Sequence, residues 1–253
     1  MYSVSRVSSN IFYTLLSMLS MIILWQFMSM IINKSYLPSF TDVIEKLCEN
    51  LLSGVLIKNS IISLTRILVA MLISLILGFS TGILIIWFRA GFVNNFIKMI
   101  VFVSYPIPHV ALLPILFYFF DIEWSKIILI LIISFYPITL SIIEWSSRFP
   151  RELSELIYIM GGNKLDLFKY VIFPSSLPGI LTGVRISFNT AYAVIFIAES
   201  LVGSNGLGYL IYYYWQILDF KSMYSAIMML SILGLSTYLV LVYLERKLLK
   251  WLY

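Results

Sequence analysis

The sequence predicts an all-α membrane protein, a bundle of about six transmembrane helices. Of its 253 residues, 61% are hydrophobic and only 11% are charged, and the mean hydropathy is +0.98. A soluble domain carries about 25% charged residues, because water must wet its surface. The apolar residues here form continuous runs, and a helix needs roughly 20 such residues to cross the hydrocarbon core. A membrane β-barrel would instead show alternating segments of about ten residues.

The apolar runs place the spans in order along the chain. We expect them at about residues 11–32, 61–88, 96–120, 126–143, 174–202 and 222–244. Between the first two, the segment TDVIEKLCENLLSG indicates a short amphipathic helix capped by Ser39 or Thr41. No linker, low-complexity tract or repeat interrupts the chain, so we expect residues 1–253 to form a single membrane domain.

Two spans carry glycines four residues apart, in GFSTG (Gly78, Gly82) and in GILTG (Gly179, Gly183). This spacing lets helices approach one another closely in a membrane. The third span contains three prolines, at positions 106, 108 and 114, which predict a kink.

The basic residues indicate how the bundle is oriented. With six spans and the N-terminus inside, the inner segments hold ten basic residues, the outer segments hold six, and Arg185 inside a span completes the seventeen. The acidic residues of the outer segments cancel the six outer bases, so the inside keeps the whole positive excess. The positive-inside rule therefore predicts cytoplasmic N- and C-termini. The formal charge of +5 needs no nucleic-acid partner to explain it.

The amino-acid composition gives little support for a metal site or an enzyme active site. The chain has one cysteine, Cys48, and one histidine, His109, so a zinc, haem or iron–sulfur site of its own is not expected. No GxxxxGK[ST] phosphate loop occurs. An intramembrane enzyme would need a nucleophile with a base, a pair of acidic residues or a set of metal ligands. We expect none of these sites in the chain and therefore no catalytic residue.

The polar stretch 144–173 is longer than a simple connection between two spans requires. Leu153, Leu156 and Ile157 recur at helical spacing, and Gly161 and Gly162 then break the helix. A second short amphipathic piece follows, and Pro174 opens the next span. The pattern predicts a helix–glycine–helix elbow at the membrane surface, which as an anonymous loop could simply anchor at the interface.

The elbow resembles the loop signature of binding-protein-dependent ABC importer permeases, which reads Glu-Ala-Ala, three residues, Gly, nine residues, Ile, one residue, Leu-Pro. Glu155, Gly161 and Pro174 stand in register with this pattern. Leu156 and Ile157 replace the two alanines, which enlarges the apolar face. Further phrases, such as SYPIPHVALLPILFYF and AESLVGSNGLGYLI, are similar to the sulfonate/taurine/nitrate-type branch, and the resemblance covers nearly the whole chain from Leu37.

The resemblance implies the type I importer fold. It also implies that the chain is a permease subunit in a bacterial plasma membrane and that a separate subunit hydrolyses ATP. In that family the elbow is the coupling helix, which docks on a separate ATPase subunit. The implied coupling residues are Arg151, Glu152, Glu155, Gly161, Gly162, Lys164, Asp166 and Pro174. The implied partners are two ATPase subunits that bind ATP and magnesium, an external substrate-binding protein, a small-molecule substrate and a second permease copy, with a homodimer as the simpler arrangement.

Polar residues in the third and fifth spans are candidates for a translocation path: Ser104, Tyr105, His109, Ser187, Asn189, Tyr192 and Glu199. Such residues either line a cavity or join helices, and Glu199 could equally bond to a neighbouring helix or to the GSNGLG loop. The resemblance assigns Gly203, Gly206 and Gly208 of that loop to an outer gate. The alternative function is the membrane subunit of another ATP-driven vitamin importer, although its paired alanine-rich helices have no counterpart here.

Overall fold

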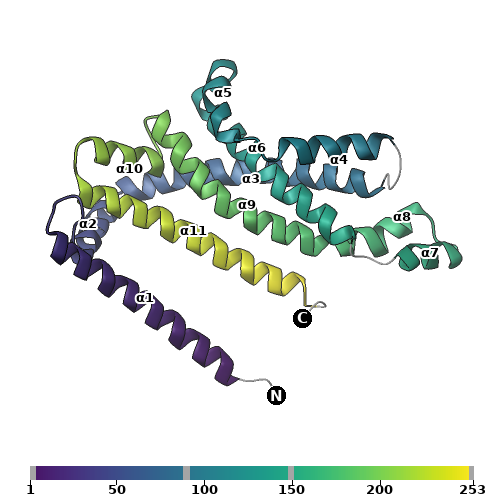
Figure 1. The fold of residues 1–253 in the computed structure, drawn as a ribbon, viewed down its shortest axis with the longest axis horizontal. Helices are drawn as coiled ribbons and strands as arrows, with labels where there is room; N and C mark the ends of the chain where they lie inside the picture. Colours follow the sequence, from purple (N-terminus) through teal and green to yellow (C-terminus); the bar gives the residue numbers. More distant parts are fainter. Residues whose placement is uncertain (1–3, 88–91, 148–150, 251–253) are drawn as a thin grey trace.

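The computed structural model describes residues 4–87, 92–147 and 151–250, and every regular element in these ranges is a helix (Figure 1). The elements are α1 (Val4–Ile32), α2 (Phe40–Leu52), α3 (Val55–Trp87), α4 (Phe92–Ser104), η1 (His109–Leu112), α5 (Leu113–Phe119), α6 (Ile122–Ser147), α7 (Arg151–Ile159), α8 (Lys164–Leu167), η2 (Phe168–Ile172), α9 (Phe173–Leu201), α10 (Leu207–Gln216) and α11 (Phe220–Leu248). The predicted all-α bundle is confirmed.

Four described helical stretches are long and apolar enough to cross a membrane: Val55–Trp87, Ile122–Trp145, Lys164–Leu201 and Phe220–Leu248. A fifth span requires that a bent pair of shorter helices, Asn95–Ser104 and His109–Phe119, crosses as one unit. The apolar stretch found in α1, Leu16–Ile32, is shorter than these spans. The expected count of six therefore exceeds the four or five spans that the described helices supply. Prolines break the third run, and most side chains before Leu16 in the first run lie outside the described part.

The centre of the bundle is a three-helix contact of α3, α6 and α9, in which glycines allow close approach. A Cβ atom on Gly78 or Gly82 of α3 would lie within 2.9 Å of Ile138 or Ile142 of α6. A Cβ atom on Gly179 or Gly183 of α9 would lie 2.6 Å from backbone atoms of α6. Both glycine pairs therefore serve the helix approach that their spacing predicted.

The short amphipathic helix α2 forms as expected, with Ser39 as its N-cap, whose Oγ accepts a hydrogen bond from the Asp42 amide at 3.1 Å. α1 diverges from the bundle and is tied to it near α2 (Figure 1). The Trp25 indole donates to the Pro38 carbonyl at 3.1 Å, and the Phe40 amide donates to Gln26 Oε1 at 3.0 Å.

The third apolar run folds into two helices that meet at 87°. α4 ends at Ser104, the turn contains Pro106 and Pro108, and α5 begins at Leu113 with Pro114 in its first turn. Proline lacks an N–H and disfavours a helical residue before it, so closely spaced prolines break the helix rather than only bending it.

The fifth apolar run continues without a break from the elbow. α8, the π-helical turn η2 and α9 form one helical stretch from Lys164 to Leu201. The Phe173 amide donates to the Phe168 carbonyl, five residues back, immediately before Pro174. A π turn widens the helix, and this relieves the clash between a proline ring and the preceding turn.

Candidate functional site

The elbow is fixed by a glycine-terminated helix end at α7. The Gly162 amide donates to the Ile157 carbonyl at 2.8 Å, and the Gly161 amide donates to the Tyr158 carbonyl at 3.0 Å. These two bonds form a Schellman motif, which requires a left-handed residue after the helix. Gly161 supplies it with φ +80°, a conformation that costs glycine little. The two glycines therefore break the helix as the sequence predicted.

The second half of the elbow begins with a capping box. Asn163 Oδ1 accepts hydrogen bonds from the amides of Leu165 and Asp166, and Asp166 Oδ2 accepts one from the Asn163 amide at 2.8 Å. This reciprocal pair satisfies helix N–H groups that would otherwise lack partners. Asp166 therefore shapes the elbow, and Asn163 is a functional candidate that the sequence reasoning missed.

The elbow projects beyond the bundle at the end opposite α2 and α10 (Figure 1). Its apolar side chains are open to solvent: Ile159 is 80% exposed, Met160 81% and Leu165 73%. Glu152, Glu155 and Lys164 are also exposed. The side chain of Arg151 and the whole of residues 148–150 lie outside the described part. Pro174 lies in the first turn of α9 and is partly exposed.

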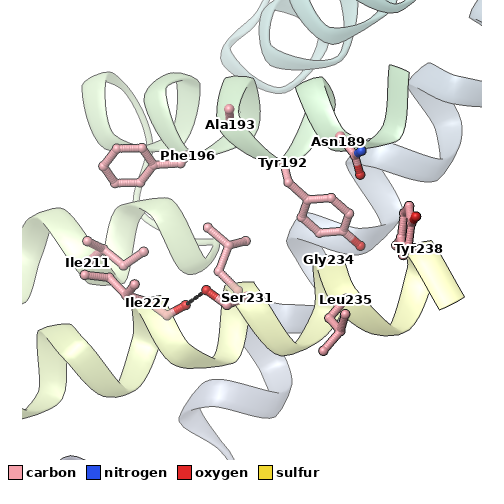
Figure 2. A pocket seen from close by; sticks show the side chains of 11 residues that line it. Asn189, Tyr192, Ala193, Phe196, Ile211, Ile227, Ser231, Gly234, Leu235 and Tyr238 are labelled. Atoms are coloured by element: carbon pink, nitrogen blue, oxygen red, sulfur yellow. Dashed lines mark hydrogen bonds between the residues drawn. The ribbon is translucent and has the colours of Figure 1, made fainter. Parts of the chain in front are cut away.

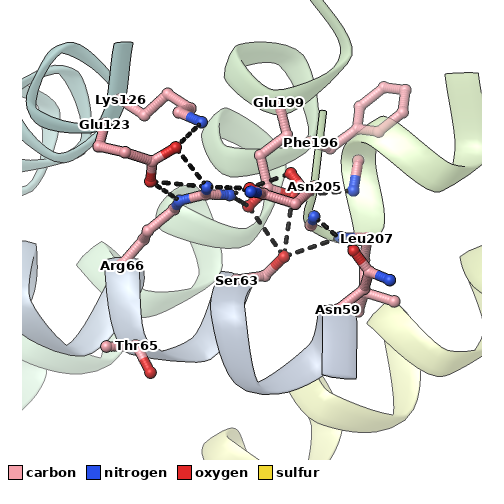
Figure 3. Close-up of polar contacts among 12 residues, drawn as sticks. Asn59, Ser63, Thr65, Arg66, Glu123, Lys126, Phe196, Glu199, Asn205 and Leu207 are labelled. Atoms are coloured by element: carbon pink, nitrogen blue, oxygen red, sulfur yellow. Dashed lines mark hydrogen bonds and ion pairs between the residues drawn. The ribbon is translucent and has the colours of Figure 1, made fainter. Parts of the chain in front are cut away.

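The opposite end of the bundle contains a buried polar network centred on Glu199 of α9 (Figure 3). Its carboxylate accepts hydrogen bonds from Arg66 Nη1 at 2.6 Å, from Ser63 Oγ at 2.8 Å and from the Gly208 amide at 2.9 Å. The side chains of Arg66 and Glu199 are 4% and 0% exposed. Because buried charges are costly unless paired and hydrogen-bonded, these partners are what allows Glu199 to be buried.

The network reaches the surface at the start of α6. Glu123, whose side chain is 53% exposed, pairs with Arg66 at 2.6 Å and with Lys126 at 2.8 Å. The Lys126 side chain is fully buried. Two cations and two carboxylates balance, so the network is neutral as a unit. The charge count placed Arg66 and Lys126 with the outer segments. Both in fact lie buried in the spans, because Arg66 pairs with carboxylates of α9 and α6, and Lys126 pairs with Glu123 one turn earlier in its own helix.

The same network holds the GSNGLG loop between α9 and α10. The Gly206 amide donates to Asn59 Oδ1 at 2.7 Å, and the Leu207 amide donates to Ser63 Oγ at 2.9 Å. Arg66 also donates to the backbone carbonyl and the side-chain oxygen of Asn205. A Cβ atom on Gly206 would overlap the Glu199 carboxylate, and one on Gly208 would lie 2.6 Å from the Phe196 carbonyl oxygen.

The sequence reasoning proposed Glu199 and the three loop glycines but missed most of their partners: Asn59, Ser63, Arg66, Glu123, Lys126 and Asn205. A signal was present in α3, where polar residues recur at positions 59, 63 and 66. Spacings of four and three residues place them on one helix face. A polar stripe inside an apolar run indicates a buried partner, here Glu199.

The candidate path residues do not gather in one place. His109, which is 9% exposed, lies with its ring centroid 4.8 Å from that of Tyr136, and Tyr105 lies 5.9 Å from the same ring. Ser104 bonds to a carbonyl of its own helix. Ser187 is fully buried and donates to the Ser134 carbonyl of α6 at 2.8 Å. Glu199 belongs to the network described above.

Asn189 and Tyr192 lie instead on the side of α9 that faces α11 (Figure 2). The Tyr192 hydroxyl is 2.7 Å from Thr237 Oγ1. Both residues line a hollow of about 660 Å³, whose other walls are mostly apolar side chains of α11. Within the described residues, no group of three or more His, Cys, Asp or Glu side chains is arranged to hold a metal ion.

Residues 74–250 match the family model described as "Binding-protein-dependent transport system inner membrane component". The chain is 29% identical to the formylaminopyrimidine transport permease protein ThiX of Halalkalibacterium halodurans, over 92% of this chain and 93% of that one. It is 27% identical to the taurine transport system permease protein TauC of Escherichia coli, over 87% and 82%.

Among solved structures, the fold is similar to a chain of the MetNI methionine ABC transporter in an inward-facing conformation. The TM-score is 0.68 at 19% identity, covering 78% of this chain and 97% of that one. The type I importer fold implied by the elbow signature is thereby confirmed. The family match covers more than half of the chain. The chain therefore belongs to the binding-protein-dependent transport system inner membrane components, and it is the membrane-spanning permease subunit of an ABC importer.

Proposed function

We propose that the elbow of residues 151–173 is the surface through which this permease is coupled to a separate ATPase subunit. The observation that carries the proposal is the cluster of exposed apolar side chains, Ile159, Met160 and Leu165, on a rigid elbow beyond the bundle. Outside the membrane, three large apolar side chains this close in the chain are costly to expose to water, so their exposure indicates that a partner protein covers them. Glu152, Glu155 and Lys164 supply a charged rim.

ATP and magnesium are bound by that partner in this proposal, because the sequence has no GxxxxGK[ST] loop. The permease transmits movement and performs no chemistry. α8 and α9 form one continuous helical stretch, so displacement of the elbow is carried directly into the span that contains Glu199. Gly161 and Gly162 keep the elbow geometry through which the force passes.

The translocation path lies, in our proposal, beside the bent pair formed by α4 and α5. Tyr105 and Ile107 of the turn are 50% and 48% exposed, and the two prolines of the turn are exposed as well. Irregular backbone at membrane depth is tolerated only where protein covers it or where it lines an aqueous cavity. A second copy of this chain, related by a two-fold axis, supplies that environment and encloses Ser104, Tyr105 and His109 along the path.

The solute is a small, water-soluble organic molecule delivered by an external binding protein. Two similar permeases are named for taurine and for formylaminopyrimidine, a sulfonate and a heterocycle of small size. The GSNGLG loop, with Gly203, Gly206 and Gly208, is the outer gate in this arrangement.

Besides the buried Arg66 and Lys126, the outer segments hold four basic residues, and two of these are ion-paired, Lys46 with Glu49 and Lys221 with Asp42. This small positive charge in the outer segments supports the assignment of the elbow and both termini to the cytoplasm.

Affinity purification of the chain from its native membrane in mild detergent tests the coupling proposal. We expect an ATPase subunit at about a one-to-one ratio with the wild type. Replacing Ile159 and Met160 together by Asp lowers its recovery by at least tenfold, because a central apolar side chain in an interface contributes about 2 kcal/mol.

The matched control is Leu52→Asp at the other end of the bundle, since Leu52 is also apolar and is 90% exposed. This control should retain the ATPase. Equal recovery of the ATPase with both variants, at equal amounts of permease in the membrane, would contradict the coupling role of the elbow.

A further inference from the structure

Two adjoining hollows between α9 and α11 form a groove that extends from α10 to the C-terminal end of α11. Its upper part, which is the part nearer α10, is the apolar hollow of about 660 Å³ that Tyr192 and Phe196 line (Figure 2). Its lower part is a second hollow of about 630 Å³ lined by charged side chains. Tyr238 of α11 lines both hollows, so the two adjoin at this residue.

The lower hollow is cationic. Arg185 of α9 donates to Glu245 of α11 at 2.8 Å, and this pair spans the groove. Arg246 and Lys250 line the same hollow and are exposed. Neither forms an ion pair with another described residue. Three cations therefore face one carboxylate, and the positive excess lies at the level where a membrane surface meets the cytoplasm in the orientation we propose.

The polarity of the groove changes in steps along its length. Two polar side chains lie above the cations. Asn189, one helical turn beyond Arg185, offers an amide, and Tyr238 offers a hydroxyl. Above these the lining becomes apolar, with Leu235 and Phe196. Gly234 has no side chain, and a Cβ there would lie 3.7 Å from the Tyr192 ring, so the groove stays open at this level.

We propose that this groove binds one anionic glycerophospholipid. Its phosphate lies between Arg246, Lys250 and the Arg185 guanidinium, its ester region contacts Asn189 and Tyr238, and an acyl chain fills the apolar part toward Phe196. The order of charge, polar groups and apolar surface in the groove is the order of these groups in such a lipid.

The groove is long enough for such a lipid. Its lining extends along the chain from Ile227 to Lys250, which at 1.5 Å per residue is about 35 Å. One leaflet contributes roughly 15 Å of hydrocarbon, half of the bilayer core, so the headgroup region and an acyl chain of one leaflet fit within this length. The charge of the groove also favours one class of lipid. The two unbalanced cations attract an anionic headgroup, whereas they contribute little binding energy to a zwitterionic headgroup.

Thermal unfolding of the full-length chain, purified in detergent with its co-expressed partner proteins, tests the proposal. The probes are palmitoyl-oleoyl phosphatidylglycerol, the corresponding phosphatidylcholine and inorganic phosphate. We expect phosphatidylglycerol to raise the unfolding midpoint at the lowest concentration, and phosphatidylcholine and inorganic phosphate to raise it little. In Arg246→Gln/Lys250→Gln, the apparent affinity for phosphatidylglycerol falls about thirtyfold, since each basic residue near an anionic surface contributes about a fivefold factor.

Two further variants separate lipid binding from general charge and from folding. Lys247→Gln removes a charge from the same turn of α11 but does not line the groove, so it should keep the wild-type response. Gly234→Phe fills the apolar part and should abolish the response to phosphatidylglycerol while the cations remain. An equal response to phosphatidylcholine, an equal response to inorganic phosphate, or an unchanged response in both groove variants would overturn the proposal.

Discussion

Both ends of the bundle depend on glycines, but for different physical reasons. At the α10 end, Gly206 has φ +105° and lies against the Glu199 carboxylate, which a side chain would overlap. At the elbow, Gly161 has φ +80° with no atom within 4 Å of where its Cβ would be. Gly206 is required both by its backbone conformation and by a neighbour that occupies the space, whereas Gly161 is required by its backbone conformation alone.

The two ends also differ in how complete they are. The α10 end buries two ion-paired cations and satisfies the loop amides internally, so its polar groups need no partner protein. The elbow satisfies its backbone with a Schellman motif and a capping box but leaves Ile159, Met160 and Leu165 exposed. A surface whose backbone is rigid while its apolar side chains are uncovered is prepared to receive a partner.

The largest effect is expected for Gly206→Ala. A methyl group there meets the buried carboxylate, so Glu199 must leave its partners, and the loss of a buried ion pair costs about 3–5 kcal/mol. We expect the midpoint of thermal unfolding to fall by roughly 10 °C. Gly54→Ala is the matched control, because Gly54 has φ +75° in open space. If both alanines cost the same, the conformation of Gly206, and not its neighbour, is what matters.

A slightly smaller effect is expected for Glu199→Gln, which keeps the shape but leaves Arg66 with Glu123 as its only carboxylate partner. Removal of one partner from a buried pair costs about 3 kcal/mol, whereas replacing both by apolar residues costs less. Arg66→Met/Glu199→Leu should therefore be more stable than either single variant, as measured by thermal unfolding in detergent. A strictly additive double variant would show that the pair is not coupled.

The sequence predicted well the features that depend on neighbours in the chain. The apolar runs predicted the helices, and Gly161 predicted the end of α7. The prolines predicted a kink in the third run, where the structure has a complete break after Ser104. It could not predict that Arg66 pairs with Glu199, since these residues lie 133 positions apart and meet only when α3 and α9 pack. Residue types likewise did not reveal that Ser187 faces α6 while Tyr192 faces α11.

At the elbow, Gly162→Ala should act on coupling more than on the stability of the bundle. A Cβ on Gly162 would lie 2.8 Å from the Ile157 carbonyl oxygen, so the Schellman motif must open. Because the elbow projects beyond the spans, we expect the unfolding midpoint to change by only about 2 °C. Recovery of the ATPase should fall at least several-fold. A large loss of stability with normal ATPase recovery would place this glycine in the core of the fold and not in the coupling surface.

The smallest effect is expected for Asn163→Ala, which removes the capping box and leaves both glycines in place. Loss of an N-cap costs about 1 kcal/mol, and α8 is a single short turn that continues directly into η2 and α9. We expect a modest loss of ATPase recovery and rescue by Asn163→Ser, because serine also caps helices well. Ser39→Ala in α2 is the control, since it removes a cap of the same kind at the far end of the bundle. If Ser39→Ala lowered ATPase recovery as much as Asn163→Ala, the effect would come from general helix stability. A loss confined to Asn163→Ala would show that the orientation of the elbow itself is what the partner recognises.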